Sequence, residues 1–160
     1  MHRTSLWIGA LALSTARLAV AGSDSAEVRT VMDTFHRAVV NHDGAQVAAL
    51  FVPEGSTWLN VLSDEAYARA KKTTPGVAKI RVGSYTEFAN FVAHSKVSIE
   101  PRHSHVNILS DGTIASAYFD FEFMIDGKLE NHGTETWVLV KGPEGWRIAA
   151  ITYSSDPSSP

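Results

Sequence analysis

Residues 97–153 decide the fold of this chain, and they read VSIEPRHSHVNILSDGTIASAYFDFEFMIDGKLENHGTETWVLVKGPEGWRIAAITY. Apolar and polar side chains alternate through most of this stretch, which is the period of half-buried β-strands. Two tight-turn dipeptides, Asp111-Gly112 and Asp126-Gly127, interrupt it, and a looser turn follows at residues 142–145. The pattern predicts four long antiparallel strands that follow one another as a meander.

The residues before the meander favour helices. Apolar side chains recur at three- and four-residue spacing from Val28 to Val39, which predicts a long amphipathic helix that ends near residues 41–44. Ser84 and Glu87 have the spacing of a capping box for a later helix. The other expected elements are helices at 45–51 and 64–72, short strands at 56–62 and 77–82, and a helix at 84–94. We therefore expect one α+β domain over residues 24–154 and a disordered Ser/Pro-rich tail at 155–160.

The first residues have the pattern of an export signal. His2 and Arg3 precede an apolar run at residues 6–13, and Ala19-Val20-Ala21 offers the small residues of a cleavage site. This predicts a signal peptide at residues 1–21 and a periplasmic or secreted protein; a disordered N-terminal tail is the alternative. The apolar run is shorter than the ~20 residues that a membrane span requires, so we expect no span.

Composition excludes several classes of function. The chain has no Cys, so it has no disulfide, thiol nucleophile, thiolate zinc site or iron-sulfur cluster. Its net charge is −3, and loss of the leader with its two arginines would make it about −5. No basic stripe interrupts this acidic balance, which argues against nucleic-acid binding. No cofactor is expected.

The two tight turns predict which side chains share a face of the meander. Two-residue turns would set His105 opposite Tyr118, His103 opposite Asp120, and Tyr118 opposite Glu135. One face would then be polar, and the other would carry Phe119, Phe121 and Phe123 among other apolar residues. Alternation alone would turn the Phe-rich face to the core and the polar face to water.

The order of elements resembles the nuclear-transport-factor-2-like superfamily over nearly all of residues 24–154. Local likeness to SnoaL-like and other stand-alone bacterial domains of unknown function, and to the association domain of calcium/calmodulin-dependent kinases, lies in Ala117-Tyr118, Glu135-Thr136 and the GWRI run at 145–148. The resemblance implies a cone-shaped fold. Its N-terminal helices would pack on a curved antiparallel sheet of about four to six strands around a small-molecule cavity.

The resemblance also implies a site. Arginines line the concave face of the kinase association domain, and the matching positions here are Asp120, Trp137 and Tyr153. The polar face would then be concave, and the expected ligand-binding residues are His103, His105, Tyr118, Asp120, Glu135, Trp137 and Tyr153. The phenylalanines would lie on the convex face, which predicts a homodimer packed sheet to sheet through Phe119, Phe121 and Phe123.

Small-molecule binding is the preferred function, because aromatic walls with a few convergent polar groups are typical of such sites. Asp120 and Glu135 would favour a neutral or cationic ligand over an anion. The alternative is an isomerase, dehydratase or cyclase in which Asp120 is the general base, His103 orients it and Tyr118 donates a hydrogen bond.

Two further alternatives stay open. A metal could bind His103 and His105 with Asp120 or Glu122, but paired histidines two residues apart are common by chance, so no metal site is predicted. The domain could also be a dimerising interaction module without chemistry.

Overall fold

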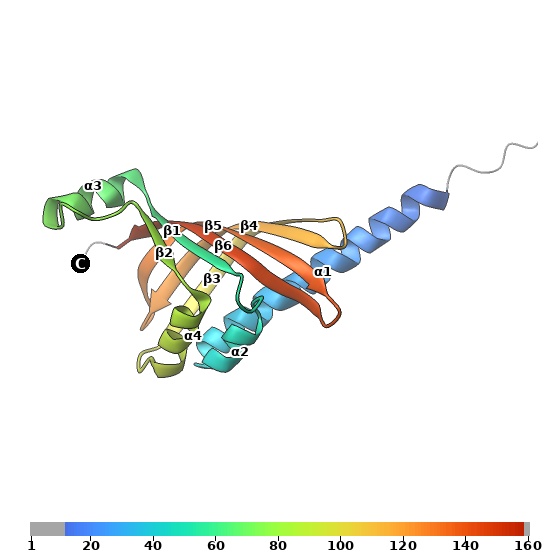
Figure 1. Ribbon diagram of the computed structural model, residues 1–160, viewed down its shortest axis with the longest axis horizontal. Helices are drawn as coiled ribbons and strands as arrows, with labels where there is room; N and C mark the ends of the chain where they lie inside the picture. The colour runs from blue at the N-terminus through green and yellow to red at the C-terminus, as the bar shows by residue number, and fades with distance from the viewer. Residues whose placement is uncertain (1–11, 159–160) are drawn as a thin grey trace, which may run out of the picture.

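The computed structural model describes residues 12–158, with side chains from residue 22 onward. Helices and strands alternate irregularly along the described chain (Figure 1). They are α1 (Ala12–Val40), α2 (Gly44–Ala49), β1 (Thr57–Leu62), α3 (Asp64–Thr73), β2 (Ile80–Gly83), α4 (Tyr85–His94), β3 (Ile99–Ser110), β4 (Ile114–Ile125), β5 (Lys128–Gly142) and β6 (Gly145–Pro157). The predicted helices, short strands and four-strand meander are therefore confirmed.

The strands form one curved six-stranded sheet in the order β2-β1-β6-β5-β4-β3. The meander accounts for the consecutive antiparallel pairs from β3 to β6. β1 pairs with β6 in parallel, so the sheet is mixed and not purely antiparallel. The α+β class is confirmed. Parallel pairing is possible here because the helices and the meander intervene between these strands in the chain.

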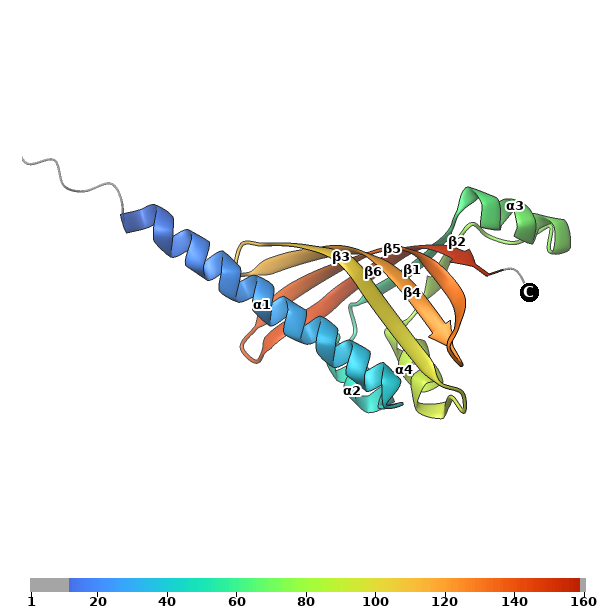
Figure 2. The ribbon, with the colours of Figure 1, turned by 180° about the vertical axis from the view of Figure 1, so that it is seen from behind.

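Three helices lie on one face of the sheet. α1, α2 and α4 are on this side, while α3 projects from the far end (Figures 1 and 2). We call this face of the sheet the inner face; its buried core residues include Ala117, Phe119, Trp137, Leu139, Ile148 and Ile151. The opposite side is the outer face.

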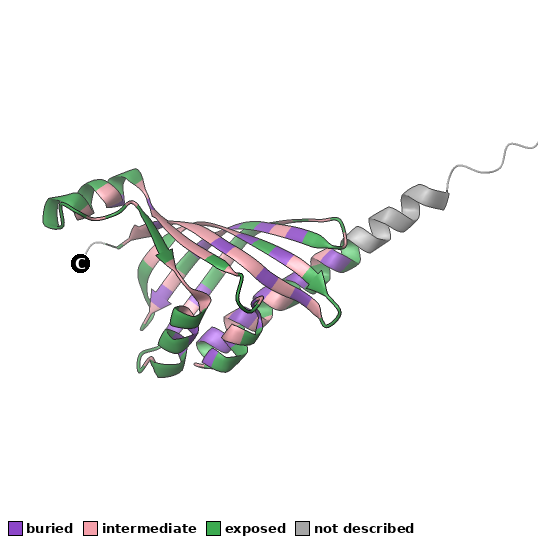
Figure 3. Ribbon diagram, viewed as in Figure 1, coloured by how far each residue is buried: buried purple, intermediate pink, exposed green. Residues whose placement is uncertain are grey.

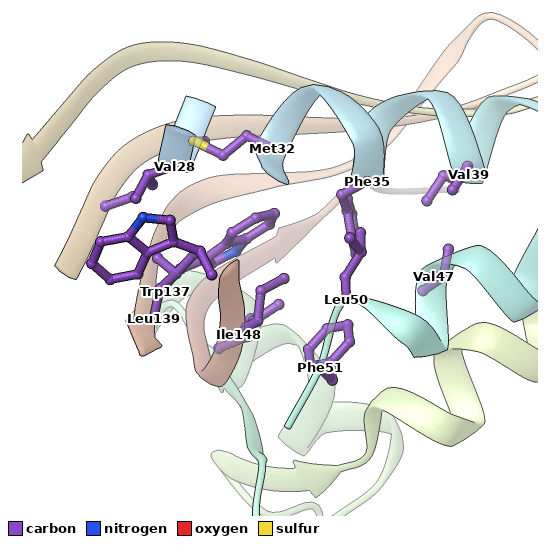
Figure 4. Close-up of a cluster of buried hydrophobic side chains, with 14 of the residues drawn as sticks. Val28, Met32, Phe35, Val39, Val47, Leu50, Phe51, Trp137, Leu139 and Ile148 are labelled. Carbon is purple, nitrogen blue, oxygen red and sulfur yellow. The ribbon is translucent and has the colours of Figure 1, made fainter. Parts of the chain in front are cut away.

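The long helix packs on the inner face through the apolar stripe that the sequence predicts. Val28, Met32, Phe35 and Val39 are all buried, and they lie on the side of α1 that faces Trp137 and the rest of the core (Figure 4). Burial of each such side chain stabilises the fold by roughly 1.5–3 kcal/mol. α1 and the neighbouring elements therefore carry much of the buried area, whereas α3 is largely exposed (Figure 3).

Side-chain caps fix where the short helices begin. Ser84 Oγ accepts the backbone N–H of Glu87 at 3.1 Å at the start of α4, as the predicted capping box requires. Asp43 caps α2 through the N–H of Gln46 at 2.8 Å. These caps set the helix ends that border the inner face.

The connections of the meander are not both two residues long. Ser110 pairs with Ala115 and not with Thr113, so the first connection is wider than predicted. This change shifts the pairing by two positions and leaves the faces unchanged, because the side-chain period of a strand is two. The second connection has the predicted pairing of Ile125 with Lys128.

A first β-bulge in β3 reverses the face of His103. The register shifts between Ser104 and Asn107, and His105 within this shift has a φ of 51°. A bulge places two residues of one strand against one of its partner, so all side chains beyond it change faces relative to the partner. His103 consequently pairs with Phe121 and lies on the inner face.

A second bulge in β5 reverses the faces of the rest of that strand. Phe123 pairs with Asn131 while Met124 pairs with Leu129, which leaves Glu130 between the two pairs. This single extra residue turns the following positions of β5 over relative to the predicted register.

The predicted assignment of the two faces is therefore wrong for β4. Phe119 and Phe121 are buried on the inner, helix-covered face, and Phe123 is partly buried there. Tyr118 and Asp120 consequently lie on the outer face. The dimer surface predicted through the three phenylalanines is wrong for the same reason, and association into a homodimer stays a prediction.

The ends of the chain differ from the expectations in part. Residues 1–11 of the predicted leader lie outside the described residues, and α1 already begins at Ala12, so the export signal stays a prediction. In the predicted disordered tail, Ser155 is buried and belongs to β6, which continues to Pro157. Its Oγ donates to Asn131 Oδ1 at 3.1 Å, and this contact orders the end of the strand. In the described part of the chain, no helix has the length and apolar character to span a membrane.

Candidate functional site

A cavity of about 320 Å³ lies between the inner face of the sheet and the helices. This volume is at the small end of the range of small-molecule sites. The lining residues come from two helices, all six strands and the loop before α4. They are Phe35, Trp58, Gly83, Ser84, Glu87, Phe88, Pro101, His103, Phe121, Phe123, Asn131, Glu135 and Tyr153.

Six aromatic side chains form a large part of the cavity wall. Phe88 on α4 stacks on Phe35 of α1, with ring centroids 5.7 Å apart, and on Trp58 of β1, at 5.1 Å. Tyr153 on β6 stands almost at right angles to both Trp58 and Phe121, with interplanar angles of 85° and 87°. These contacts hold rings from several different elements around one space.

Among the described residues, Glu135 is one of the two acidic groups that line the cavity, and Glu87 at the start of α4 is the other. Glu135 follows the β5 bulge, pairs with Phe119 on β4 and with Tyr153 on β6, and so projects from the inner face. Trp137 Nε1 donates a 2.6 Å hydrogen bond to Glu135 Oε1. Glu135 is partly accessible and lines the cavity, so its accessible part faces the cavity.

Burial raises the pKa of Glu135 to about 7, although the hydrogen bond from Trp137 favours the charged form. The carboxyl group is therefore divided between its neutral and its charged form at physiological pH. A small change in its surroundings can move the proton on or off, which suits either ligand recognition or proton transfer.

His103 is the second titratable group on the inner face. Its ring lies 4.6 Å from that of Phe119 and 5.8 Å from that of Trp137. Burial, together with the charge of His36, lowers the pKa of His103 to about 4. His103 is therefore a neutral imidazole at pH 7 and contributes hydrogen-bonding atoms without a positive charge.

The hydroxyl group of Tyr153 is oriented by a short chain of hydrogen bonds. Asn60 Nδ2 donates to Tyr153 Oη at 3.0 Å, and Arg81 Nη2 donates to Asn60 Oδ1 at 3.3 Å. Because the Tyr153 oxygen accepts from Asn60, its own proton remains available to donate to a bound molecule.

The structure brings together only some of the predicted site residues. His103, Glu135 and Tyr153 line the cavity as predicted. Trp137 lies on the same face but is 0% exposed in the core below the cavity, where it positions Glu135.

Tyr118, Asp120 and His105 were also expected in the cavity, and the structure contradicts this. All three lie on the outer face, where Tyr118 is 52% exposed and His105 Nδ1 is 2.8 Å from Asp120 Oδ2. The proposed catalytic set of Asp120, His103 and Tyr118 is therefore not assembled. The two bulges are the reason. The bulge in β3 brings His103 to the inner face and the bulge in β5 brings Glu135 there, whereas Asp120 on β4 stays on the outer face.

His103 and His105 lie on opposite faces of the sheet, so they do not form the alternative metal site together. Within residues 22–158, no group of three or more His, Asp or Glu side chains is arranged to hold a metal ion.

Sequence patterns alone do not reveal most of the wall. The predicted register turns the phenylalanines of β4 away from the cavity, and the residues at the start of α4 carry no signal of a cavity. Phe35 and Phe88 could have been suspected from their places on the apolar faces of two amphipathic helices.

Comparison with known proteins gives a consistent family but no function. The family model for the SnoaL-like domain matches residues 28–157. No curated protein matches the chain at a significant level.

Solved structures with the same fold share little sequence with this chain. An NTF2-like protein with a cystatin-like fold from Novosphingobium aromaticivorans has a TM-score of 0.64 at 15% identity, covering 96% of this chain and 94% of its own. A conserved protein from Planctomyces limnophilus has a TM-score of 0.64 at 16% identity, with 86% and 99% covered.

A third similar structure is a putative dehydratase of the NTF2-like family from Streptomyces avermitilis, with a TM-score of 0.61 at 17% identity over 87% of this chain and 99% of that one. At these identities the likeness concerns the fold, whereas the family model covers most of the chain itself. The chain has the fold of the NTF2-like proteins and belongs to the SnoaL-like domain family.

Proposed function

We propose that this protein binds a small organic molecule in the cavity on the inner face of its sheet. The observation that carries the proposal is the carboxyl group of Glu135, set in a cavity of about 320 Å³ whose wall contains six aromatic rings. Apolar walls with a few placed polar groups are the usual form of a small-molecule site. Affinity would come from burial of the ligand's apolar surface against the rings.

The polar groups of the cavity restrict the ligand. Tyr153 has a proton to donate, Glu135 can accept or donate, and His103 is neutral at pH 7. No lysine or arginine is among the described lining residues, so an anionic ligand would find no countercharge. A neutral or cationic molecule with at least one hydrogen-bonding group fits this set.

A cavity-filling variant tests the proposal. Ligands are first found by saturation-transfer NMR with a library of small organic molecules. Phe121→Trp adds volume to the cavity wall without changing its polarity much. We expect this variant to weaken the binding of each ligand at least tenfold. Tyr118→Phe on the outer face is the matched control and should bind as the wild type does. Equal binding to both variants, or stronger loss in Tyr118→Phe, would place the ligand elsewhere and contradict the proposal.

Proton transfer within the bound molecule is a second candidate function. The specific observation in its favour is the pKa of Glu135, about 7, because a general base works best when its pKa lies near the operating pH. Glu135 would take the role expected for Asp120, and Tyr153 or neutral His103 would donate a hydrogen bond to a developing oxyanion.

Deuterium exchange measures this activity without knowledge of the natural substrate. An enolisable aromatic ketone such as 2-tetralone should exchange its α-protons with D₂O faster in the presence of the protein, with a rate that rises with pH through about 7. Glu135→Gln should lower the catalysed rate by about 10²–10⁴-fold, whereas Asp120→Asn should not change it. Unaltered exchange in Glu135→Gln would exclude Glu135 as the base.

A further inference from the structure

The charges that face the cavity are all of one sign. Glu135 lies within the cavity, and Glu87, on the first turn of α4, is exposed and lines the cavity at its mouth. Within residues 22–158, whose side chains are described, no cationic side chain joins them in the lining. His103 does not compensate, because burial keeps its pKa near 4. The route inward therefore passes two carboxyl groups at different depths.

The carboxyl group of Glu135 has only part of its hydrogen-bonding capacity filled. Trp137 donates to Oε1, and in the described part of the chain no other side chain bonds to this carboxyl group. A carboxylate can accept about four hydrogen bonds through its two oxygens. Oε2 is therefore available to a group that enters the cavity, and a charged partner would satisfy it best.

Six aromatic rings surround the same space: Phe35, Trp58, Phe88, Phe121, Phe123 and Tyr153. Their planes differ widely, since Tyr153 is nearly perpendicular to both Trp58 and Phe121. Phe88 stacks between Phe35 and Trp58. Tyr153 is nearly perpendicular to Trp58, so the rings border the space from more than one direction. The negative face of an aromatic ring attracts a cation within about 6 Å, and a cage of such rings is the usual receptor for alkylammonium groups.

We propose that the cavity selects an organic cation, a small molecule whose protonated or quaternary amine sits among the aromatic rings and pairs with Glu135. This inference rests on the proposed binding function and names the class of its ligand. The apolar substituents of the amine contact the rings, and the positive charge faces the carboxylate. Glu87 attracts the cation at the mouth, and the negative net charge of the chain acts in the same direction.

A neutral ligand that hydrogen-bonds to protonated Glu135 is the competing class. It would use Glu135 and the rings, but it would gain nothing from the carboxyl group of Glu87 or from the absence of any cationic side chain in the described lining. The two classes also differ in pH dependence. A cation binds best when Glu135 is ionised, so its affinity should rise with pH through about 7, whereas a neutral ligand that accepts from the protonated acid should bind more weakly as pH rises.

Choline and its carbon isostere 3,3-dimethyl-1-butanol provide a matched pair of probes, because they differ mainly in the charge. Calorimetry with the wild-type protein at pH 8 should give at least tenfold tighter binding of choline than of the alcohol. Between pH 8 and pH 6 the affinity for choline should fall by up to tenfold, while that for the alcohol should not fall. Glu135→Gln should lower the affinity for choline at least tenfold more than that for the alcohol, and should remove the pH dependence.

Controls separate the electrostatic argument from damage to the fold. Asp120→Asn removes a carboxylate of the outer face and should leave choline binding unchanged. Glu87→Gln should weaken choline binding by a few-fold at low ionic strength and less at high salt, because an exposed charge is screened. Thermal unfolding of each variant shows that it is folded.

The outcomes distinguish this inference from the function on which it rests. If the alcohol binds as tightly as choline, or if choline does not bind while neutral molecules of the library do, the cation class is wrong and the binding function stands. If neither probe binds and no library molecule binds, both proposals fail. Choline affinity that is unaffected by Glu135→Gln overturns the assignment of Glu135 as its partner.

Discussion

Replacement of Glu135 by glutamine is expected to raise the free energy of unfolding at pH 8 by about 3 kcal/mol. In the folded protein burial raises the pKa of Glu135 from 4.5 to about 7, so the neutral form is favoured. This raised pKa makes a contribution to the free energy of unfolding that is fully present below pH 4.5 and is lost as pH rises through 7. Glutamine has the shape of the neutral acid and can still accept from Trp137, so it avoids the charged state that destabilises the wild type above pH 7.

The same variant should expose the opposite pH dependence of His103. Its pKa falls from 6.5 to about 4 on folding, so the corresponding stability is present above pH 6.5 and is lost as pH falls through 4. Between pH 4.5 and 6.5 the unfolded chain carries its proton on His103, whereas the folded protein carries one on Glu135. The two effects cancel in the wild type. Without Glu135, unfolding should become easier by about 3 kcal/mol between pH 6.5 and pH 4.

Urea unfolding at pH 8, 6.5 and 4.5 measures both effects. The difference between variant and wild type at each pH isolates Glu135, because the other titrating groups are common to both proteins. The loss of stability of the variant itself between pH 6.5 and pH 4.5 reports His103 together with the other carboxyl groups. Glu87→Gln is the matched control, because this side chain is exposed and its removal should change stability little. If Glu135→Gln changes the free energy of unfolding by the same amount at pH 8 and at pH 4.5, then Glu135 is not buried as a neutral acid. Increased stability together with lost binding would identify a site that is held at a cost to the fold.

Gly44→Ala is expected to destabilise the protein by about 2–3 kcal/mol, because it overpacks the contact between α2 and α4. Gly44 is buried at the first position of α2, and the two helices lie side by side (Figure 1). A Cβ atom there would come closer to the backbone oxygen of Ala89 than the 3.0 Å that real Cβ atoms keep, and would lie 2.8 Å from Ala93 Cβ. The neighbours are backbone and a fixed methyl group, so one helix must move.

The loss should extend to the cavity, since α4 carries Phe88 and Glu87 in its wall. We therefore expect Gly44→Ala to weaken ligand binding as well as to lower the midpoint of urea unfolding. Helix propensity acts in the opposite direction, because alanine in a helix is more favourable than glycine by about 1 kcal/mol. A net loss therefore reports the clash.

Gly76→Ala is the control for the same change in an open place, since a methyl group added at Gly76 would have no atom within 4 Å. It should be neutral or slightly stabilising. If Gly44→Ala unfolds at the same urea concentration as Gly76→Ala, then α2 and α4 are not in tight contact.

Much of the fold follows from local patterns that no distant contact overrides. The apolar stripe from Val28 to Val39, the Ser84 cap and the Asp126-Gly127 turn each depend on a few neighbouring residues, and each has its predicted role. The parallel pairing of β1 with β6 could not be predicted in this way, because it joins segments about ninety residues apart that no local pattern relates.

The candidate site was predictable only in part, because it depends on which face each strand presents. His103, Glu135 and Tyr153 line the cavity as predicted, while Tyr118 and Asp120 lie on the other side of the sheet. The sequence by itself determined the helices and strands, their order and most turns. It also determined that the strands of the meander carry acidic and aromatic side chains. Only the tertiary structure decided where the register shifts, above all at the bulges at His105 and at Glu130 that set the faces of the site residues. One extra residue in a strand reverses every side chain beyond it, and packing of Phe119, Phe121 and Trp137 against α1 and its neighbours selects the register in which the large rings are buried.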